Sequence, residues 1–319
     1  VYGRILREDG DFIGIVEHKD ATEEQRKIEE VNPGVYLFQW KALEAVLNHL
    51  TDNNVQAEYY LTDAIHLLVK DSQRVGSVVL EDPTEVLGVN SFKELAYAEN
   101  FLRQRILDQW MLKGVKIHDP NQTFVDSNVV LESGIEILPG TLLQGNTLIA
   151  KDCIIGPYTQ LKDVKVGHGS TIAFSVVQET EIAEEVSIGP FAHIRPESYI
   201  GAHCKVGNFV ELKKAHLQEG TKASHLSYLG DVTIGKRCNI GAGTITCNYD
   251  GKHKHPTHIG DRVFVGSNST LVAPLTLGDD TYIAAGSAIT SDLPSGTLGI
   301  GRSRQINKEG WIERKEQRL

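Results

Sequence analysis

Two polar stretches in the second half of the chain carry the side chains best suited to chemistry. Residues 218–231 and 245–258 both contain histidine, lysine and tyrosine, and both lie between segments richer in aliphatic residues. Histidine is the side chain that titrates closest to neutral pH, so proton transfer is the chemistry that such a stretch offers most readily. The same composition is typical of solvated surface loops, and by itself it leaves both interpretations open.

The overall composition limits the partners that this chemistry could serve. The chain has 319 residues, of which 40% are hydrophobic and 23% are charged, as expected for a globular protein with two domains. A net charge of −10 argues against general binding to nucleic acid or to membrane surfaces. The apolar runs are too short to span a membrane, and the opening residues do not have the pattern of a secretory signal. Four cysteines without a CxxC motif indicate reduced thiols and a cytoplasmic location: Cys153, Cys204, Cys238 and Cys247.

The elements that must position the polar stretches repeat every six residues. Aliphatic residues recur without error from Ile182 to Leu212 and again from Ile259 to Ile289, often followed by glycine. Neither a helix nor an ordinary strand has this period, whereas a hexapeptide array specifies a parallel β-helix in which each repeat is a short strand plus a turn. The aliphatic residues are expected to point inward. The two polar stretches are expected to interrupt the array as loops too long for its corners.

The first 90 residues have a different pattern, which is typical of an incomplete α/β domain. The usual glycine-rich first loop of a nucleotide-binding domain does not occur here. We expect a β-hairpin from residues 2–7 and 12–16, further strands at residues 35–38 and 75–80, and helices at residues 42–50 and 61–69.

A longer helix is expected to link the two halves. Ser91 and Glu94 have the spacing of a capping box, and Gly114 is a plausible end. Leu95, Ala98, Leu102 and Ile106 would fall on one face of this helix. We therefore predict three segments: an α/β portion at residues 1–90, a linker helix at 91–114, and a β-helix with a C-terminal arm at 115–319.

Four longer motifs resemble the bifunctional bacterial GlmU family: Gly14–Asp20, Gly207–Lys214, His225–Asp231 and Asn239–Gly251. Members of this family act as glucosamine-1-phosphate N-acetyltransferase and as N-acetylglucosamine-1-phosphate uridylyltransferase. The resemblance extends from Tyr2 to about Trp311. The family's N-terminal portion, with its nucleotide-binding loop and a metal-binding aspartate, has no counterpart in this sequence.

The resemblance implies a left-handed β-helix, a homotrimer, and acetyl transfer from acetyl-CoA to the 2-amino group of glucosamine 1-phosphate. In the intact family protein, uridylyl transfer from UTP then gives UDP-N-acetylglucosamine and pyrophosphate, for peptidoglycan and lipopolysaccharide precursors. His225 matches the general base, which is consistent with the need to remove a proton from the attacking amine. The residues that match sugar-phosphate contacts are Arg195, Lys213, Tyr228, Asn239 and Lys254. Those that match acetyl-CoA contacts are Ala242, Asn248, Tyr249, Ser267, Ala285 and Arg302.

In the α/β half, the resemblance implies UDP-sugar contacts at Gly3, Glu17, Asn32 and Asn90, with Asn90 also matching a ligand of Mg²⁺. One asparagine cannot hold Mg²⁺, which prefers octahedral oxygen coordination with carboxylates and phosphates. We therefore expect the uridylyl site to be a remnant in this chain.

Three other interpretations stay open. A sugar-nucleotide pyrophosphorylase also joins an α/β domain to a β-helix, although a shorter one without the His225 and Asn248-Tyr249 segments. A non-catalytic hexapeptide subunit would need the coils but not the polar stretches. A zinc-dependent hydratase on the same fold would need clustered histidine ligands, and no repeated spacing stacks these four on one edge: His193, His203, His216 and His225.

Overall fold

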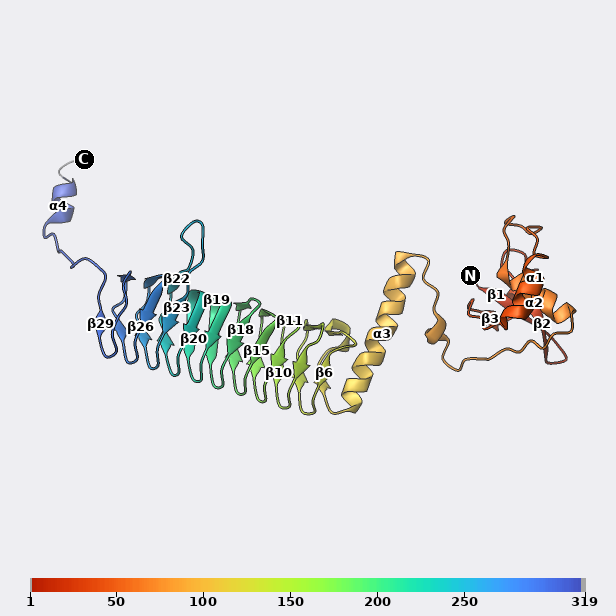
Figure 1. Ribbon diagram of the computed structural model, residues 1–319, viewed down its shortest axis with the longest axis horizontal. Coiled ribbons are helices and arrows are strands. Elements are labelled where there is room, and N and C mark those ends of the chain that lie inside the picture. Colours follow the sequence, from red (N-terminus) through yellow and green to blue (C-terminus); the bar gives the residue numbers. More distant parts are fainter. Residues whose placement is uncertain (1, 317–319) are drawn as a thin grey trace. The chain divides into compact units, whose positions relative to one another are not determined.

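The computed structural model of the protein describes residues 2–316 (Figure 1). The chain divides into two compact units between Phe101 and Leu102. No helix within the described residues combines the length and the apolar composition needed to cross a membrane.

The N-terminal unit is built on a small antiparallel sheet with strand order β2-β1-β3. A tight turn joins β1 to β2, and its central residues Asp9 and Gly10 have φ angles of 49° and 90°, as a two-residue hairpin turn requires. The expected hairpin and both expected helices are therefore confirmed. The elements of this unit are β1 (Gly3–Glu8), β2 (Asp11–Val16), η1 (Gln25–Lys27), β3 (Val31–Asn32), α1 (Trp40–Leu47), α2 (Leu61–Lys70) and η2 (Pro83–Val86).

Two strands predicted in this unit, at residues 35–38 and 75–80, are wrong. Both segments lack regular secondary structure, and several of their apolar side chains face solvent, with Leu37 fully exposed and Val78 89% exposed. The sheet has three strands, and none of them pairs with either segment. A short apolar run becomes a strand only where a neighbouring strand accepts its hydrogen bonds.

Helix α3 (Phe92–Leu112) begins with the predicted capping box. The Ser91 hydroxyl accepts a hydrogen bond from the Glu94 amide at 3.2 Å, and Glu94 Oε2 accepts one from the Asn90 amide at 2.8 Å. The chain turns away at Gly114, whose φ is +88°. The predicted apolar face is only partly correct, because Leu95 and Leu102 are exposed. Only the last turns pack on the β-helix, through Ile106, Leu107, Trp110 and Met111.

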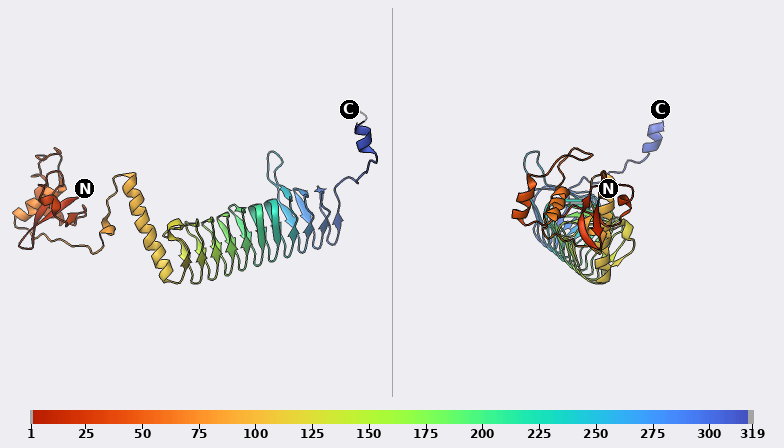
Figure 2. Two further views of the ribbon diagram at one scale, coloured as in Figure 1. Left: turned by 180° about the vertical axis from the view of Figure 1, so that it is seen from behind. Right: turned by 90° about the vertical axis from the view of Figure 1, so that its right-hand side faces the viewer.

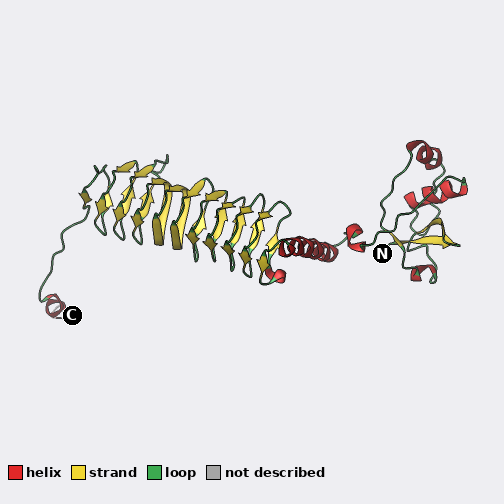
Figure 3. Cartoon of the chain, turned by 90° about the horizontal axis from the view of Figure 1, so that it is seen from below, coloured by secondary structure: helices red, strands yellow, loops and turns green. Residues whose placement is uncertain are grey.

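The second unit is a left-handed parallel β-helix of hexapeptide repeats, as predicted. Its coils stack along one axis and overlie one another when seen end-on, and their short strands form continuous ladders (Figures 2 and 3). A 3-10 turn, η3 (Pro120–Gln122), lies near its start, and α4 (Trp311–Glu316) follows its end. The strands are β4 (Lys116–Ile117), β5 (Phe124–Val125), β6 (Val130–Leu131), β7 (Glu136–Ile137), β8 (Leu142–Gln144), β9 (Leu148–Ile149), β10 (Ile154–Ile155), β11 (Gln160–Lys162), β12 (Lys165–Val166), β13 (Thr171–Ile172), β14 (Val176–Gln178), β15 (Thr180–Ile182), β16 (Ser187–Ile188), β17 (His193–Ile194), β18 (Ser198–Ile200), β19 (Lys205–Leu217), β20 (Lys222–Ile234), β21 (Asn239–Ile240), β22 (Ile245–Cys247), β23 (Thr257–Ile259), β24 (Phe264–Val265), β25 (Thr270–Val272), β26 (Leu275–Leu277), β27 (Tyr282–Ile283), β28 (Ala288–Ile289) and β29 (Leu298–Gly299).

Pairing between coils keeps the aliphatic residues in line. Ile155 pairs with Ile172, Ile172 with Ile188, and Ile188 with Val206, so successive coils contain 16 to 18 residues. These side chains are buried in one continuous core that runs along the axis of the prism. The six-residue period therefore predicted the inward positions correctly.

The expected interruption at residues 218–231 is wrong. This stretch belongs to a regular coil, in which β20 pairs with β19 from Lys205↔Lys222 to Leu217↔Ile234. Ala223 and Leu229 occupy its inward positions and are fully buried. The small alanine side chain hides the aliphatic period in the sequence, although it fills the same place in the core.

The second interruption is real but shorter than predicted. Thr246 occupies an inward position of β22, so the coil stays regular up to that strand. The pairing Val232↔Thr257 spans 25 residues, whereas the next one, Thr257↔Leu275, spans 18. The extra length projects as a loop between β22 and β23 (Figure 1).

Strand β10 offers a matched test of the inward positions. Ile155 is fully buried, whereas its neighbour Ile154 is 40% exposed. We expect Ile155→Val to lower the free energy of unfolding by about 0.5–1.5 kcal/mol, because it removes one buried methylene. Ile154→Val is the control and should stay within about 0.5 kcal/mol of wild type in urea denaturation. Equal effects of the two substitutions would contradict the assignment of inward and outward faces.

Candidate functional site

Each coil turns at three corners, and corners of successive coils stack into three edges. In the coil formed by β19 the corners lie at Phe209, Lys214 and Gly220, all with positive φ. We call the first the histidine edge, which consists of Asn208, His225, Ala242, Ser267 and Ala285. The second, the lysine edge, consists of Arg195, Lys213, Gly230 and Cys247. The third, the aspartate edge, consists of Glu219, Lys236, Asp261 and Asp279. These assignments follow the pairing between strands.

His225 is exposed on the histidine edge and is held by one side chain. Its Nδ1 lies 2.6 Å from Oδ1 of Asn208, the residue paired with it on β19. An amide oxygen only accepts hydrogen bonds, so Nδ1 donates and carries the proton. The lone pair of the neutral ring is therefore on Nε2, which can act as a base. Asn208 was not predicted as a site residue, although its 17-residue spacing from His225 places the two on adjacent coils.

The same edge continues along the axis through three small residues predicted to bind acetyl-CoA. Ala242, Ser267 and Ala285 are exposed or half-buried. Backbone hydrogen bonds tie their coils together, from the Asn268 amide to the Ala242 carbonyl at 2.7 Å and from the Gly286 amide to the Ser267 carbonyl at 2.8 Å. The structure thus brings these three residues into one file with His225, and their short side chains leave the backbone of this edge accessible.

The lysine edge gathers three of the predicted cations. Arg195 forms an ion pair with Glu211 at 3.1 Å, and Lys213, whose side chain is only 14% exposed, lies 3.8 Å from Asp231. Lys254 lies beside Lys213, which lowers the pKa of Lys254 through direct contact and charge repulsion. Two ammonium groups held next to each other favour an anionic group between them, such as a phosphate.

Asp231 connects this edge to Asn248. The Asn248 amide donates a hydrogen bond to the same Asp231 carboxylate that faces Lys213. Gly230 permits this approach, since a Cβ there would lie 2.5 Å from the Tyr228 hydroxyl and 2.8 Å from the Asn248 amide nitrogen. Tyr228 lies on the face between the histidine edge and the lysine edge, and its hydroxyl points toward the lysine edge. Asp231 and Gly230 were not predicted as site residues.

The loop between β22 and β23 is ordered by its own hydrogen bonds. The Asp250 carboxylate accepts from the His253 and Lys252 amides at 2.7 Å and from His255 Nε2 at 2.8 Å. These bonds, chiefly the one from the His253 amide, lower the pKa of Asp250 to about 2. Tyr249 is exposed, and its hydroxyl donates to the Gly251 carbonyl at 2.7 Å. The loop thereby presents Lys254 at the lysine edge.

Two predicted residues lie apart from both edges in the single chain. Asn239 is exposed on the face between the aspartate and histidine edges, in line with Phe264 on the next coil. Arg302 is exposed in the segment after β29, next to Gly301, whose carbonyl accepts a hydrogen bond from the Ala288 amide. One chain therefore does not gather all of the predicted acetyl-site residues in one place.

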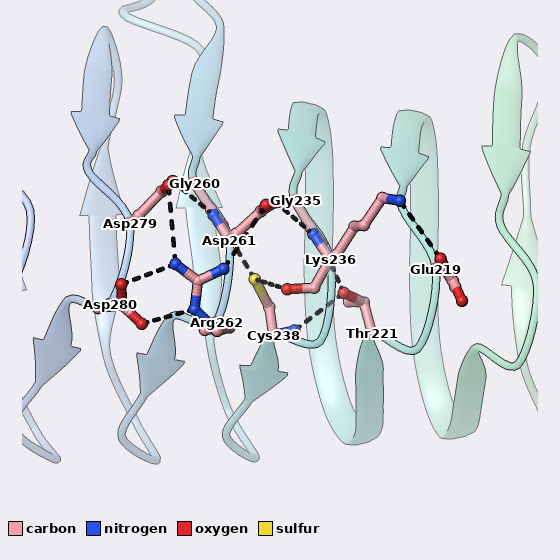
Figure 4. Close-up of polar contacts among 10 residues, drawn as sticks. All are labelled: Glu219, Thr221, Gly235, Lys236, Cys238, Gly260, Asp261, Arg262, Asp279 and Asp280. Atoms are coloured by element: carbon pink, nitrogen blue, oxygen red, sulfur yellow. Dashed lines mark hydrogen bonds and ion pairs between the residues drawn. The ribbon is translucent and has the colours of Figure 1, made fainter.

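The aspartate edge holds none of the predicted residues and is a ladder of ion pairs (Figure 4). Lys236 pairs with Glu219 at 3.3 Å, and Arg262 forms two bonds of 2.7 Å with Asp280. Behind the ladder, the buried Cys238 thiol donates to the Gly260 carbonyl, and burial raises the pKa of Cys238. All four cysteines are free.

In the N-terminal unit, three of the four predicted UDP-sugar contacts lie together. Gly3 pairs with Asn32 across β1 and β3, and a Cβ on Gly3 would lie 3.6 Å from Glu17 Oε2. Glu17 Oε1 accepts a hydrogen bond from the Thr62 hydroxyl at 3.0 Å, while Asn32 donates to the Tyr36 hydroxyl at 2.6 Å. These contacts hold the side chains of Glu17 and Asn32 beside Gly3 in a polar cluster at the end of the sheet.

Asn90, the predicted ligand of Mg²⁺, lies just before α3. Its backbone amide donates a hydrogen bond to the Glu94 carboxylate in the first turn of the helix. No group of three or more histidine, cysteine, aspartate or glutamate residues that could hold a metal ion occurs among residues 2–316. Asn90 is the predicted ligand in the described residues, and one amide oxygen does not complete the coordination of Mg²⁺, which is usually held by one or two carboxylates together with phosphates.

Comparisons with known proteins match both the repeats and the chain as a whole. Residues 179–214 match the family described as bacterial transferase hexapeptide (six repeats), and residues 231–251 and 256–291 match the hexapeptide repeat of succinyl-transferase. Bifunctional protein GlmU of Geobacillus sp. (strain WCH70) is 47% identical over 314 residues, which cover 98% of this chain and 68% of that protein. The proteins of the same name from Caldanaerobacter subterraneus subsp. tengcongensis and Fervidobacterium nodosum are 50% and 48% identical, over 98% and 100% of this chain and 68% and 69% of their own lengths. Among solved structures, LpxA, a UDP-N-acetylglucosamine acyltransferase from Bacteroides fragilis, is 16% identical with a TM-score of 0.32, over 56% of this chain and 69% of that one.

Proposed function

Because this chain belongs to the bifunctional GlmU family, we propose that it transfers the acetyl group of acetyl-CoA to the 2-amino group of glucosamine 1-phosphate. One observation carries the proposal. An exposed histidine whose Nδ1 is held by Asn208 lies on one edge, and a cluster of cations lies on the next edge of the same coils. His225 and Gly230 are five residues apart, so their Cα atoms are separated by at most about 18 Å. We propose that the sugar phosphate lies between them, with its phosphate at the cations and its amine at the base.

The proposed reaction assigns each edge a task. Arg195, Lys213 and Lys254 bind the phosphate, with Tyr228 and Asn239 completing the sugar site. His225 Nε2 accepts a proton from the amine as its nitrogen attacks the thioester carbon. The carbon–sulfur bond then breaks, and the imidazolium returns the proton to the departing thiolate, giving CoA and the N-acetyl sugar phosphate.

The acetyl-CoA contacts are proposed along the histidine edge and beside it. Ala242, Ser267 and Ala285 extend this edge away from His225 toward the C-terminal coils. An extended ligand can follow such a file, because the small side chains leave backbone groups accessible along it. Asn248, Tyr249 and Arg302 complete the proposed contacts, and Arg302 supplies a cation for the phosphates of CoA.

We propose a homotrimer whose sites are shared between subunits. An exposed row of aromatic rings lies beside the histidine edge, on the coil of Asn208 and on three preceding coils, with centroid separations of 5.4 to 5.8 Å: Tyr158, Phe174, Phe191 and Phe209. Large apolar side chains exposed in a continuous row favour burial against another surface. A second copy would also bring Asn239 and Arg302 to sites that they do not reach within their own chain.

Complementation tests the shared site. We expect a His225→Ala chain and an Arg302→Ala chain, each inactive alone, to regain partial activity after subunit exchange, because some mixed sites combine both native residues. Activity is followed by release of the CoA thiol, and mass measurements verify that the trimers are mixed. Full activity of a monomeric species would contradict the shared site. Mixed trimers without activity would show that His225 and Arg302 of one active site come from the same chain.

For the N-terminal unit we propose a UDP-sugar role for Gly3, Glu17, Asn32 and Asn90, in a uridylyl transfer that this chain does not complete. Asn90 alone does not complete the coordination of Mg²⁺, which is usually held by one or two carboxylates together with phosphates. We also propose the three-segment division at residues 1–90, 91–114 and 115–319, and a cytoplasmic location in keeping with the free thiols.

Acetyl-CoA consumption with glucosamine 1-phosphate is the direct test of the proposed function. Thiol release should depend on this acceptor, and unphosphorylated glucosamine, which lacks the group that the lysine edge would bind, should be a poor substitute. A chain that binds neither substrate and releases no thiol would instead support the non-catalytic hexapeptide subunit. UTP-dependent release of pyrophosphate by this chain would contradict the remnant uridylyl site.

A further inference from the structure

Asn208 is half-buried and contacts the imidazole of His225 from the neighbouring coil. Strands β19 and β20 pair over their whole lengths, and Asn208↔His225 is one of their paired positions. The backbone on both sides is fixed, since the Ser227 hydroxyl donates to the His225 carbonyl at 2.9 Å and the Phe209 amide donates to the Phe191 carbonyl at 3.0 Å. The separation of the two side chains is therefore set by the β-helix itself.

The chemistry of this contact determines where the proton of His225 lies. The Asn208 amide oxygen faces Nδ1 at 2.6 Å, so the neutral ring keeps its hydrogen on Nδ1. An imidazole without a partner exchanges between two tautomers, and only one of them presents the lone pair of Nε2 to solvent. The second consequence is electrostatic, because an amide holds the tautomer without a negative charge that would favour the imidazolium.

The other ionisable groups on the surrounding strands are separated from the Asn208–His225 pair by two or more residues along the chain. The adjoining stretch of the next coil, residues 239–246, contains no titratable side chain. On β19 and β20 the titratable groups flanking the pair are Lys205, Glu211, Lys222 and Tyr228. Glu211 is engaged by Arg195 at 3.1 Å, on the side of the lysine edge. Asn208 is thus the polar side chain that the structure pairs with the ring of His225.

We propose that Asn208 is a positioning residue that holds His225 as the Nδ1–H tautomer and so keeps Nε2 available to the amine of the acceptor. The inference rests on the proposed acetyl transfer. In this role Asn208 contacts neither substrate, and it affects the rate only through the tautomer of the His225 imidazole.

Two substitutions separate this role from a merely structural one. Asn208→Ala removes the acceptor and should lower kcat about tenfold with little change in KM for glucosamine 1-phosphate, the lower end of the range for partners that orient metal-binding histidines. Asn208→Asp keeps an acceptor for Nδ1 but adds a charge that raises the pKa of the ring. It should therefore recover rate at high pH and move the acidic limb of the kcat profile to higher pH. Asn146→Ala, at an exposed asparagine in an earlier coil, is the control and should match wild type.

A spectroscopic measurement tests the tautomer without relying on activity. In protein labelled with ¹⁵N-histidine, the His225 resonances, assigned by their loss in His225→Gln, should report a protonated Nδ1 in wild type and in Asn208→Asp. In Asn208→Ala they should report exchange between tautomers. A proton on Nε2 in wild type, or an unchanged kcat and pH profile in Asn208→Ala, would overturn the inference. If no protein transferred acetyl, wild type included, the proposed function would be wrong. The tautomer could still be judged, because the NMR measurement does not depend on activity.

Discussion

Replacing His225 with alanine is expected to lower the turnover of acetyl transfer by about 10²–10⁴-fold, the range typical of losing a general base. The reason is that Nε2 of His225 is the free basic nitrogen on the histidine edge, and the attacking amine must lose a proton. Binding of acetyl-CoA should stay close to wild type, because its proposed contacts lie on other coils. Steady-state kinetics and calorimetric titration with CoA measure the two effects separately.

His216→Ala is the matched control for this substitution. His216 is exposed like His225, but it belongs to β19 and lies on a different face, where it pairs with Tyr199 and Thr233. Its removal should leave turnover unchanged. If His225→Ala turned over at the wild-type rate, another group or water would have to accept the proton, and the proposed mechanism would be wrong.

Gly207→Ala is expected to destabilise the β-helix by about 3 kcal/mol or more and to abolish activity. A Cβ on Gly207 would overlap the carbonyl oxygen and the carbonyl carbon of Ser224 on the next coil. Both are backbone atoms in a paired strand, so they cannot move aside as a flexible side chain would. Because Ser224 precedes His225, any shift that relieves the overlap also displaces the proposed base.

Urea denaturation and the acetyl-transfer assay together measure this effect. Gly76→Ala is the control, since a Cβ at Gly76 would meet no atom within 4 Å and its φ is not positive. It should leave both stability and activity unchanged. A Gly207→Ala protein with wild-type stability would show that β19 and β20 can separate without cost, against the close pairing described above.

The β-helix was predictable because its core needs the same kind of side chain at every sixth position. The prediction failed where that requirement was met by another residue, as with Ala223 and Thr246, whose small side chains fill inward positions without continuing the aliphatic period. The two wrong strands in the N-terminal unit failed for a different reason. Apolar content predicts a strand only if a partner strand is present, and the sequence of residues 35–38 contains no information about such a partner.

The candidate site was less predictable than the fold. Periodicity indicates which side chains point outward, but it does not tell which of the three edges they occupy. Asn208, Gly230 and Asp231 become recognisable only when the length of each coil is known, since residues meet across coils at separations of 16 to 18 positions. The positions of Asn239 and Arg302 depend on neighbouring chains in our proposal, and no pattern within one sequence encodes those contacts.

The near-constant length of the coils also restricts how sequences of this family can change length. Removing one whole coil would join matching faces and leave the remaining inward residues inward. Deleting a single residue within a strand would turn its aliphatic side chains toward solvent. The longer connection before β23, with its span of 25 residues at Val232↔Thr257, is tolerated because its extra residues leave the prism between two strands. Gaps in alignments of GlmU sequences should therefore fall at corners or remove complete coils, and strand interiors should be free of them.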